Sequence, residues 1–304
     1  MKKILLIVRA RGSKRRAVED FAREIQSKLQ GDTVIELCDI SELFFELSDD
    51  RLSIYHPQKK FDVRDFDLVI IRNVGVYVYE AHAISQYCDY FNITYTDTYL
   101  NRLLLDSKLS TQFLLWCSGI KNWPHTMYGP VDEMVKRFEE FNGRAVLKAN
   151  DGSRGHFNYV VQTAKDLRAI IDRNPDKHFL LQEFIPNDSD LRVLVLNSKP
   201  AMAIRRTGDG SSHLNNTSQG GGAELIPINQ IDSQVLSVCV KASDATKLQV
   251  AGVDVVYNLD TGKFLLLEIN NAPQVSSGVF IDEKVDVYID MIRDLLDYGV
   301  RYDR

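Results

Sequence analysis

Two apolar stretches near the end of the chain, residues 250–257 and 263–269, flank the sequence Asp260-Thr261-Gly262. A three-residue loop that ends in a left-handed glycine is a common hairpin connection. The pattern therefore predicts two antiparallel strands, with Leu259 paired with Lys263. Because both strands consist largely of valine, leucine and isoleucine, the fold around them must bury both.

This hairpin carries polar side chains that apolar strands do not usually contain. The predicted pairing places Asp254 opposite Glu268, and Asn270 shares the face of Glu268 because side chains alternate along a strand. Facing carboxylates repel each other unless a cation lies between them. Oxygen ligands suit Mg²⁺ or Mn²⁺, so a metal site is one interpretation. The alternative is that the two acids are solvated or salt-bridged.

Composition limits the class of protein. The 304 residues correspond to roughly two domains. The net charge of −5 has the opposite sign to the basic surface of a nucleic-acid-binding protein, so no nucleic-acid partner is expected. The four cysteines form no C-x-x-C pair, which favours buried, reduced thiols in a cytoplasmic protein. No apolar run approaches the ~18 residues of a spanning helix, so no membrane partner is expected either.

The first hundred residues alternate between strand and helix patterns. Residues 4–8 predict a buried strand, residues 17–29 an amphipathic helix, and residues 33–37 and 67–72 further strands. This alternation favours a small parallel sheet that ends near residue 100. Residues 41–65 show little periodicity and predict an irregular insertion.

A lysine precedes a glycine-containing loop in the middle of the chain. Lys148 ends a predicted strand, and Gly152 and Gly155 follow it. A lysine and flexible backbone N–H groups suit phosphate binding. The order is not that of a Walker A loop, and an ordinary hairpin loop is the alternative.

Two further segments offer nucleotide-binding chemistry. Gln182, Glu183 and Phe184 end a predicted strand whose backbone can pair with an adenine, and Asp190 follows. The second segment contains Arg205-Arg206 and a polar loop that ends in glycines; it suits phosphate binding. The alternatives are plain sheet in the first case, and a solvated arginine pair with a flexible loop in the second.

The order of these elements along the chain resembles the ATP-grasp superfamily. Lysine before a glycine loop is followed by Q-E-F-I, D-x-R, R-R, N-N-T-S-Q-G-G-G-A, V-A-G-V-D and L-E-I-N-N-A-P. Within the superfamily the chain is most similar to the RimK-like carboxylate–amine ligases, over about residues 100–275.

The resemblance implies roles for particular residues. Lys108, Lys148, Gly152, Gly155, Gln182, Glu183, Phe184 and Asp190 match nucleotide-binding positions. Arg206 and Asn216 match catalytic positions on the phosphate side. Asp254, Glu268 and Asn270 match metal ligands. The cofactors implied are ATP and Mg²⁺ (or Mn²⁺).

The resemblance also implies the fold class. We expect α/β and α+β architecture: an N-terminal parallel-sheet domain over residues 1–100, a central grasp subdomain over 101–180, and a C-terminal grasp subdomain with the metal site over 181–304. ATP would bind between the two grasp subdomains. Residues 150–155 and 211–222 would be the lids that exclude water.

Departures from the family pattern lie in the glycine loop over the phosphates and in the last motif, which lines the acceptor side in the family. The family usually has a glycine two residues after the position of Gly155, where this chain has Phe157. Its last motif usually ends N-A-S-P-G, whereas residues 270–274 read N-N-A-P-Q. The substrates of the family therefore do not transfer to this chain.

The function implied is a ligase that joins a carboxylate to an amine through an acyl phosphate. The partners would be a carboxylate substrate and an amine, which is an amino acid or a peptide; the sequence does not indicate the oligomeric state. Two alternatives remain open: an ATP-binding grasp protein without ligase turnover, and a kinase-like enzyme that stops at a phosphorylated product.

Overall fold

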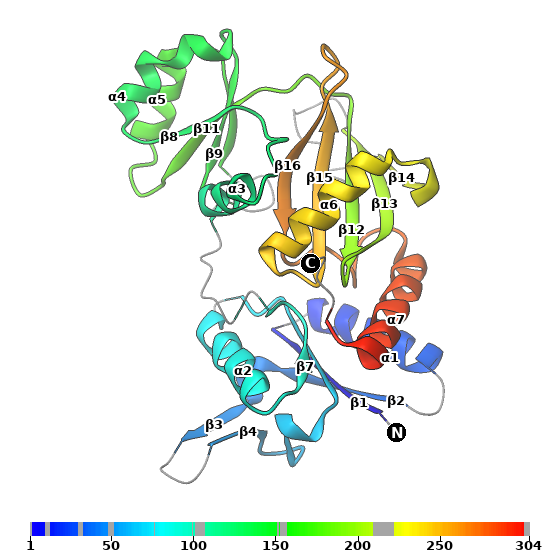
Figure 1. Cartoon of the computed structure of the whole chain (residues 1–304). Helices are drawn as coiled ribbons and strands as arrows, with labels where there is room; N and C mark the ends of the chain where they lie inside the picture. Colours follow the sequence, from blue (N-terminus) through cyan, green and yellow to red (C-terminus); the bar gives the residue numbers. More distant parts are fainter. Residues whose placement is uncertain are drawn as a thin grey trace.

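The computed structural model describes residues 2–9, 13–29, 33–47, 52–75, 77–98, 100, 107–150, 152, 157–208 and 222–300. Its sheets combine parallel and antiparallel strands, and the predicted α/β and α+β fold class is confirmed (Figure 1). No helix in these ranges is long and apolar enough to cross a bilayer.

The N-terminal sheet is parallel, as predicted. Its order is β2-β1-β6-β7, with bounds β1 Lys2–Val8, β2 Thr33–Asp39, β6 Leu68–Arg72 and β7 Thr94–Tyr95. Side chains of β1 alternate between two cores, because Ile4 and Leu6 face α1 (Ser13–Leu29) while Leu5 and Ile7 face α2 (Val78–Tyr90). Helices cover both faces of the sheet, which explains why its strands are continuously apolar.

The prediction of an irregular insertion over residues 41–65 is wrong. These residues form a second, antiparallel sheet with strands β3 Phe44–Leu47, β4 Leu52–His56 and β5 Phe61–Asp62. Ile54 and Val63 are buried in the core shared with α2. The strands are too short to show the two-residue hydrophobic period of a strand. They are stabilised by burial against the rest of the domain, which the local sequence does not reveal.

The central sheet has the order β10-β9-β11-β8. Its strands are β8 Thr126–Tyr128, β9 Ala145–Ala149, β10 Asn158–Val161 and β11 Phe179–Glu183. Helices α4 (Val131–Lys136) and α5 (Ala164–Asp172) pack on it around Phe138 and Leu167. Helix α3 (Lys108–Cys117) precedes this sheet in the sequence and contacts α6 (Ser233–Thr246).

The C-terminal sheet is antiparallel with the order β14-β13-β12-β15-β16. Its strands are β12 Ser189–Leu196, β13 Lys199–Thr207, β14 Gly222–Ile226, β15 Val250–Tyr257 and β16 Phe264–Asn270. One face is apolar and packs on α6, with Val193 and Val253 in that core. On the other face Leu194 and Leu196 pack on α7 (Ile281–Tyr298). The remainder of that second face carries the polar residues of the candidate site.

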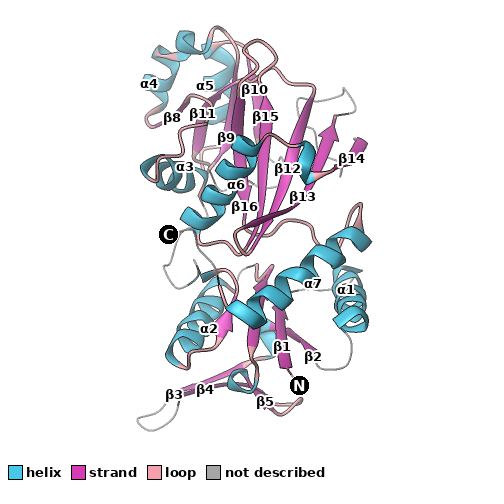
Figure 2. Ribbon diagram, turned by 45° about the vertical axis from the view of Figure 1, so that its right-hand side comes forward, coloured by secondary structure: helices cyan, strands magenta, loops and turns pink. Residues whose placement is uncertain are grey.

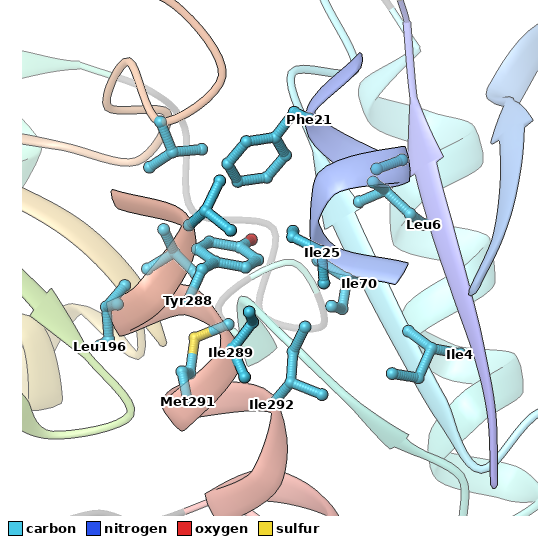
Figure 3. Close-up of a cluster of buried hydrophobic side chains, with 14 of the residues drawn as sticks. Ile4, Leu6, Phe21, Ile25, Ile70, Leu196, Tyr288, Ile289, Met291 and Ile292 are labelled. Carbon is cyan, nitrogen blue, oxygen red and sulfur yellow. The ribbon is translucent and has the colours of Figure 1, made fainter. Parts of the chain in front are cut away.

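Helix α7 joins the C-terminal sheet to the N-terminal sheet. Figure 3 shows Ile289, Met291 and Ile292 of α7 between Leu196 on one side and Ile4 on the other. The ring of Tyr288 meets that of Phe21 on α1 edge to face, with centroids 5.4 Å apart. Both views of the ribbon place α7 between the two sheets (Figures 1 and 2). The two ends of the chain thus share one hydrophobic core.

The predicted β15–β16 hairpin is confirmed, but its loop is longer by one residue. The Asn258 N–H donates to the Lys263 carbonyl at 2.9 Å, so the loop runs from Leu259 to Gly262. Gly262 is left-handed, with φ 68°. A bulge between Asp254 and the next residue shifts the register back. The bulge restores the predicted pairing of Asp254 with Glu268.

Candidate active site

One face of the C-terminal sheet collects the polar residues that the sequence singled out. Arg192 on β12 lies opposite Asp254 on β15, which lies opposite Glu268 on β16. Asp190 on β12 lies opposite Arg206 on β13. These side chains share a face because strand side chains alternate and the registers are in step. We refer to this set, with Asn270, as the polar face.

Asp254 is the centre of the polar face. Its two carboxylate oxygens accept from the Nε and Nη2 atoms of Arg192, each at 2.7 Å. Arg206 contacts the same carboxylate at 3.1 Å. Burial acts to raise the pKa of Asp254, but the two arginines outweigh it and hold that pKa at about 2. Asp254 is therefore a carboxylate at any physiological pH.

Asp190 behaves differently although it lies on the same face. Its carboxylate accepts from the Arg206 Nε at 2.5 Å, and both side chains are buried. Burial and the charge of Asp254 raise the pKa of Asp190 to about 6. The nucleotide-site acid implied by the resemblance thus faces Arg206. Its direct effect in this arrangement is to orient that guanidinium.

Glu268 connects β16 to the glycine-containing loop. The Lys108 Nζ lies 3.0 Å from the Glu268 carboxylate and donates to the Gly152 carbonyl at 2.5 Å. Lys108 begins α3, and its backbone N–H donates to the Asn150 carbonyl at 3.2 Å. One lysine therefore ties the start of α3 to the loop after Lys148 and to a predicted metal ligand.

The predicted metal ligands lie together and offer oxygen donors. Asp254 and Glu268 are cross-strand partners, and the Asn270 Nδ2 donates to the Asp254 carboxylate at 3.3 Å. In the structure the charge of Asp254 is balanced by arginines, as the salt-bridged alternative expected. Asp254 already receives four contacts, two from Arg192 and one each from Arg206 and Asn270. A carboxylate has about four lone-pair sites, so a cation at Asp254 must replace one of these contacts, whereas Glu268 is half-exposed and pairs with Lys108. The donor set of two carboxylates and an amide fits a hard cation such as Mg²⁺.

Lys148 projects from β9 and is held by a buried amide. Its Nζ donates to the Gln182 Oε1 at 2.6 Å, and the Gln182 Nε2 donates to the Thr126 hydroxyl at 2.9 Å. Gln182 is only 1% exposed. It is placed to orient Lys148 and has little surface for a nucleotide. Burial lowers the pKa of Lys148 to about 8, because the charged form is desolvated.

The predicted adenine-pairing segment has part of its backbone already engaged. The Glu183 N–H donates to the His125 carbonyl at 2.8 Å, and the Glu183 carboxylate accepts from the His125 N–H at 3.2 Å. A nucleotide base would have to pair with other backbone groups of this segment. The Phe184 ring carries the Arg144 guanidinium over it at 3.6 Å from the centroid, a contact that the sequence did not reveal.

Several predicted residues lie outside the described ranges. These are Gly155, Asn216 and most of both proposed lids. The described edge of the first loop is informative, because Phe157 is left-handed, with φ 54°. The family glycine at this position is thus replaced by phenylalanine without loss of the backbone conformation that glycine favours.

Arg192 belongs to the polar face, although it is not among the site residues expected from the sequence. The motif D-x-R contains the signal that would have found it. Arg192 lies two residues after Asp190 on a strand, so both side chains must point to the same face.

The fold is that of ATP-grasp ligases. A ligase of Chryseobacterium gregarium, described as RiPP-associated and in complex with ADP and a leader and core peptide, superimposes with a TM-score of 0.69 at 14% identity, covering 99% of this chain and 98% of that one. D-alanine–D-alanine ligase of Bacillus anthracis, complexed with ATP, gives 0.68 at 14% identity, with the same coverages of 99% and 98%.

The sequence comparisons narrow this class. The family model described as the RimK-like ATP-grasp domain matches residues 106–295, and the chain belongs to that family. A probable alpha-L-glutamate ligase of Xanthomonas euvesicatoria is 27% identical over 246 residues, which cover 79% of this chain and 80% of that protein. One of Aeromonas salmonicida is 25% identical over 268 residues, covering 84% and 87%. ATP and Mg²⁺ are the cofactors of this family.

Proposed function

We propose that the protein is an ADP-forming carboxylate–amine ligase that uses ATP and Mg²⁺ and forms an amide or peptide bond through an acyl phosphate. The observation that carries the proposal is the polar face. Four cations, Lys108, Lys148, Arg192 and Arg206, gather around the carboxylates of Asp254 and Glu268. Such a mixture of charges suits a polyphosphate together with a divalent cation.

The residues would divide the work as follows. Lys148 would bind nucleotide phosphate as a point charge, and Arg206 would face the phosphoryl group. Asp254, Glu268 and Asn270 would hold Mg²⁺, which would offset charge on phosphate oxygens when bound. A guanidinium already fixed by Asp190 or Asp254 needs little reorganisation during the reaction.

The chemistry explains why ATP is needed. A carboxylate does not react with an amine at neutral pH, because its oxide is a poor leaving group. A carboxylate oxygen would attack the γ-phosphorus of ATP, and ADP would leave with the electrons of the broken P–O bond. The amine would then attack the acyl carbon, lose a proton, and expel inorganic phosphate. Water must be excluded meanwhile, because an acyl phosphate hydrolyses readily.

The substrates are proposed from two kinds of relative. The curated relatives are named probable alpha-L-glutamate ligases, which supports an amino acid as the amine. Structures of similar fold are described in complex with precursor peptides, which supports a peptide as the carboxylate partner. We also propose the three units 1–100, 101–180 and 181–304, with the nucleotide between the second and third.

The proposal is tested by trapping the activated acid. The protein is incubated with Mg²⁺, ATP, concentrated hydroxylamine and ¹⁸O-labelled carboxylates from amino-acid and peptide pools. We expect ADP release stimulated by carboxylate, a hydroxamate, and one ¹⁸O atom in the phosphate. The matched control is Glu224→Gln. Glu224 is an exposed acid of β14, and in the described part of the chain its ion pair is with the exposed Arg205.

Two results would replace the proposal. ATP binding without carboxylate-stimulated ADP release and without hydroxamate would indicate a binding protein. ADP release with a stable phosphorylated product that persists in the presence of amines would indicate a kinase.

A further inference from the structure

The segment between β16 and α7, residues 271–280, is held by its carbonyl groups from two directions. The Arg72 Nη2 donates to the Pro273 carbonyl at 3.0 Å. The Lys284 Nζ donates to the Ser277 carbonyl at 3.1 Å. Arg72 belongs to the N-terminal sheet and Lys284 to α7, so two cations from distant parts of the sequence converge on one segment. We call residues 271–280 the β16–α7 segment.

Arg72 is an unusual anchor because it is a buried charge. It is the last residue of β6 and is 4% exposed. Within the described part of the chain its Nε and Nη1 atoms have no hydrogen-bond partner. Burying a guanidinium costs free energy unless contacts compensate for it. Its Nη2 donates to the Pro273 carbonyl, and its charge also acts on the buried Asp97 and on Tyr288. Arg72 therefore links the β16–α7 segment to the N-terminal sheet and to α7.

Lys284 completes the hold from the first turn of α7. Lys284 is 5% exposed. Gly278 of the segment is left-handed, with φ 82°, and a Cβ atom added to it would lie 3.9 Å from the Lys284 Nζ. Tyr288 follows one helical turn later on the same face of α7 and interacts with Arg72. Helix α7 therefore supports both cations at once.

The segment borders the polar face at the end of β16. It begins directly after Asn270. Pro273 packs closely on Gly252: a Cβ atom added to Gly252 would lie 2.8 Å from the proline ring. The Arg192 Cδ borders the same spot at 3.7 Å. In Figure 1 β16 runs downward, away from β9 and β11, and the segment that follows it meets Arg72 of the N-terminal sheet. Lys148 and Gln182, the residues proposed for the nucleotide side, belong to those two strands and not to the elements that hold the segment.

From this arrangement we infer that Arg72 and Lys284 are positioning residues for the amine substrate. They fix the β16–α7 segment as the wall against which the amine lies when it attacks the acyl carbon. The inference rests on the proposed function and assigns a task within it to the N-terminal sheet. It implies that the first step, transfer of phosphate to the carboxylate, proceeds without this hold. The second step, attack by a substrate-sized amine, depends on it.

Hydroxylamine separates the two steps. It is small and is used at high concentration, so it needs no wall to reach the acyl phosphate. Arg72→Gln and Lys284→Met are assayed for hydroxamate with hydroxylamine, and for amide with pools of the twenty amino acids and of tryptic peptides. We expect hydroxamate formation within about twofold of wild type and amide formation reduced at least tenfold. Arg72→Lys, which keeps a donor for the Pro273 carbonyl, should recover part of the amide yield.

Two controls and a second measurement complete the test. Arg293→Gln, an exposed arginine of α7, and Lys241→Met, an exposed lysine of α6, should change neither product. Amide hydrogen exchange over residues 271–280 should rise in Arg72→Gln and Lys284→Met with Mg²⁺ and a non-hydrolysable ATP analogue bound. This measurement needs no turnover, so it reports on the hold even if ligation fails.

The outcomes are distinct. Wild-type protein that forms no hydroxamate defeats the proposed function, while raised exchange in the variants would still establish the hold. Hydroxamate and amide that fall by equal factors, or exchange that does not change, overturn the inference. Wild-type protein that forms hydroxamate but no amide from either pool overturns the assignment of the segment to the amine.

Discussion

Arg192 and Asp254 form a bidentate ion pair across β12 and β15, with both contacts at 2.7 Å, and only 8% of the Asp254 side chain is exposed. The pair sits where cross-strand register brings the two residues opposite each other. The same carboxylate is a predicted metal ligand. The two arginines keep the Asp254 carboxylate charged and oriented, and a cation that binds this carboxylate would replace one of its present contacts.

Removing one partner of this pair should destabilise the fold. Arg192→Leu leaves Asp254 with Arg206 alone, and breaking a buried pair in this way costs about 3 kcal/mol. Urea denaturation should show this loss as a lower midpoint with an unchanged slope. The double variant Arg192→Leu with Asp254→Leu should recover most of the loss, since no buried charge is left unpaired. A double variant less stable than the single one would contradict this account.

Glu268→Gln should separate folding from catalysis. The Glu268 side chain is 39% exposed and pairs with Lys108, so its charge adds little to stability. As a proposed Mg²⁺ ligand, it should lower turnover at least a hundredfold when neutralised, in line with several kcal/mol of lost charge stabilisation. Hydroxamate formation and thermal unfolding are the two measurements, with Glu224→Gln as control. Near-normal turnover would remove Glu268 from the metal site.

Asp97 should make the stability depend on pH. It is 3% exposed, and burial raises its pKa to about 7, although Arg72 acts in the opposite direction. Between its unfolded pKa of about 4 and the folded value, the folded state binds more protons, so stability falls as pH rises through that range. Above pH 7 the contribution stays constant.

Asp97→Asn removes this titration without a change of shape. Asparagine tolerates the left-handed backbone at this position, where φ is 60°. The variant should gain stability relative to wild type at pH 8, and the difference between the two should shrink as pH falls toward 5. Chemical denaturation at several pH values measures it. A difference that does not change with pH would show that Asp97 is charged in the fold throughout.

Phe157 tests whether the left-handed conformation at the family glycine is under strain. The ring is 37% exposed and lies 5.2 Å from the Lys177 Nζ, so truncation removes limited packing. Phe157→Ala removes that packing but keeps the steric cost of a positive φ. Phe157→Gly removes both the packing and that steric cost. Phe157→Gly should therefore be more stable than Phe157→Ala by about 1 kcal/mol, the reverse of the order in ordinary strands. Equal stabilities would mean that the backbone relaxes.

The sequence predicted which residues of the hairpin lie together, but not the contacts around them. Asp254, Glu268 and Asn270 were brought together by hairpin arithmetic alone, because strand alternation is a strict rule. The arithmetic assumed a loop one residue too short, and the bulge beside Asp254 compensated for the error. Bulges leave no periodic signal, so this agreement was not guaranteed by the pattern.

Long-range contacts account for what the sequence did not reveal. Arg72 is separated from Pro273 by 201 residues, and nothing near either residue indicates the contact. The small β3–β4–β5 sheet was missed because its strands are short and tertiary burial stabilises them. Gln182 was assigned to the nucleotide, but its burial and its bond to Lys148 depend on β8 and β9 as neighbours. Local pattern carries none of this information.

Lys148 should take up a proton when ATP binds. Burial holds its pKa near 8 in the free protein, and the phosphates of a bound nucleotide would raise it, since they stabilise the ammonium form. At pH 7 the lysine is already charged, whereas at pH 8.5 much of it is neutral and must be protonated on binding. ATP affinity should consequently decline as pH rises above about 8, by at most tenfold per pH unit. Adenosine, which has no phosphate, should show no such decline.

Calorimetry in two buffers measures this proton directly. At pH 8.5 the apparent enthalpy of ATP binding should differ between buffers of unlike ionisation enthalpy, and the difference should vanish at pH 7. Lys148→Met should abolish the buffer dependence and weaken ATP far more than adenosine, because only ATP loses an ion pair. Lys165→Met, an exposed lysine of α5, should behave as wild type. If wild type gave equal enthalpies in both buffers at pH 8.5, or if Lys148→Met weakened ATP and adenosine equally, the lysine would serve the fold and not the phosphates.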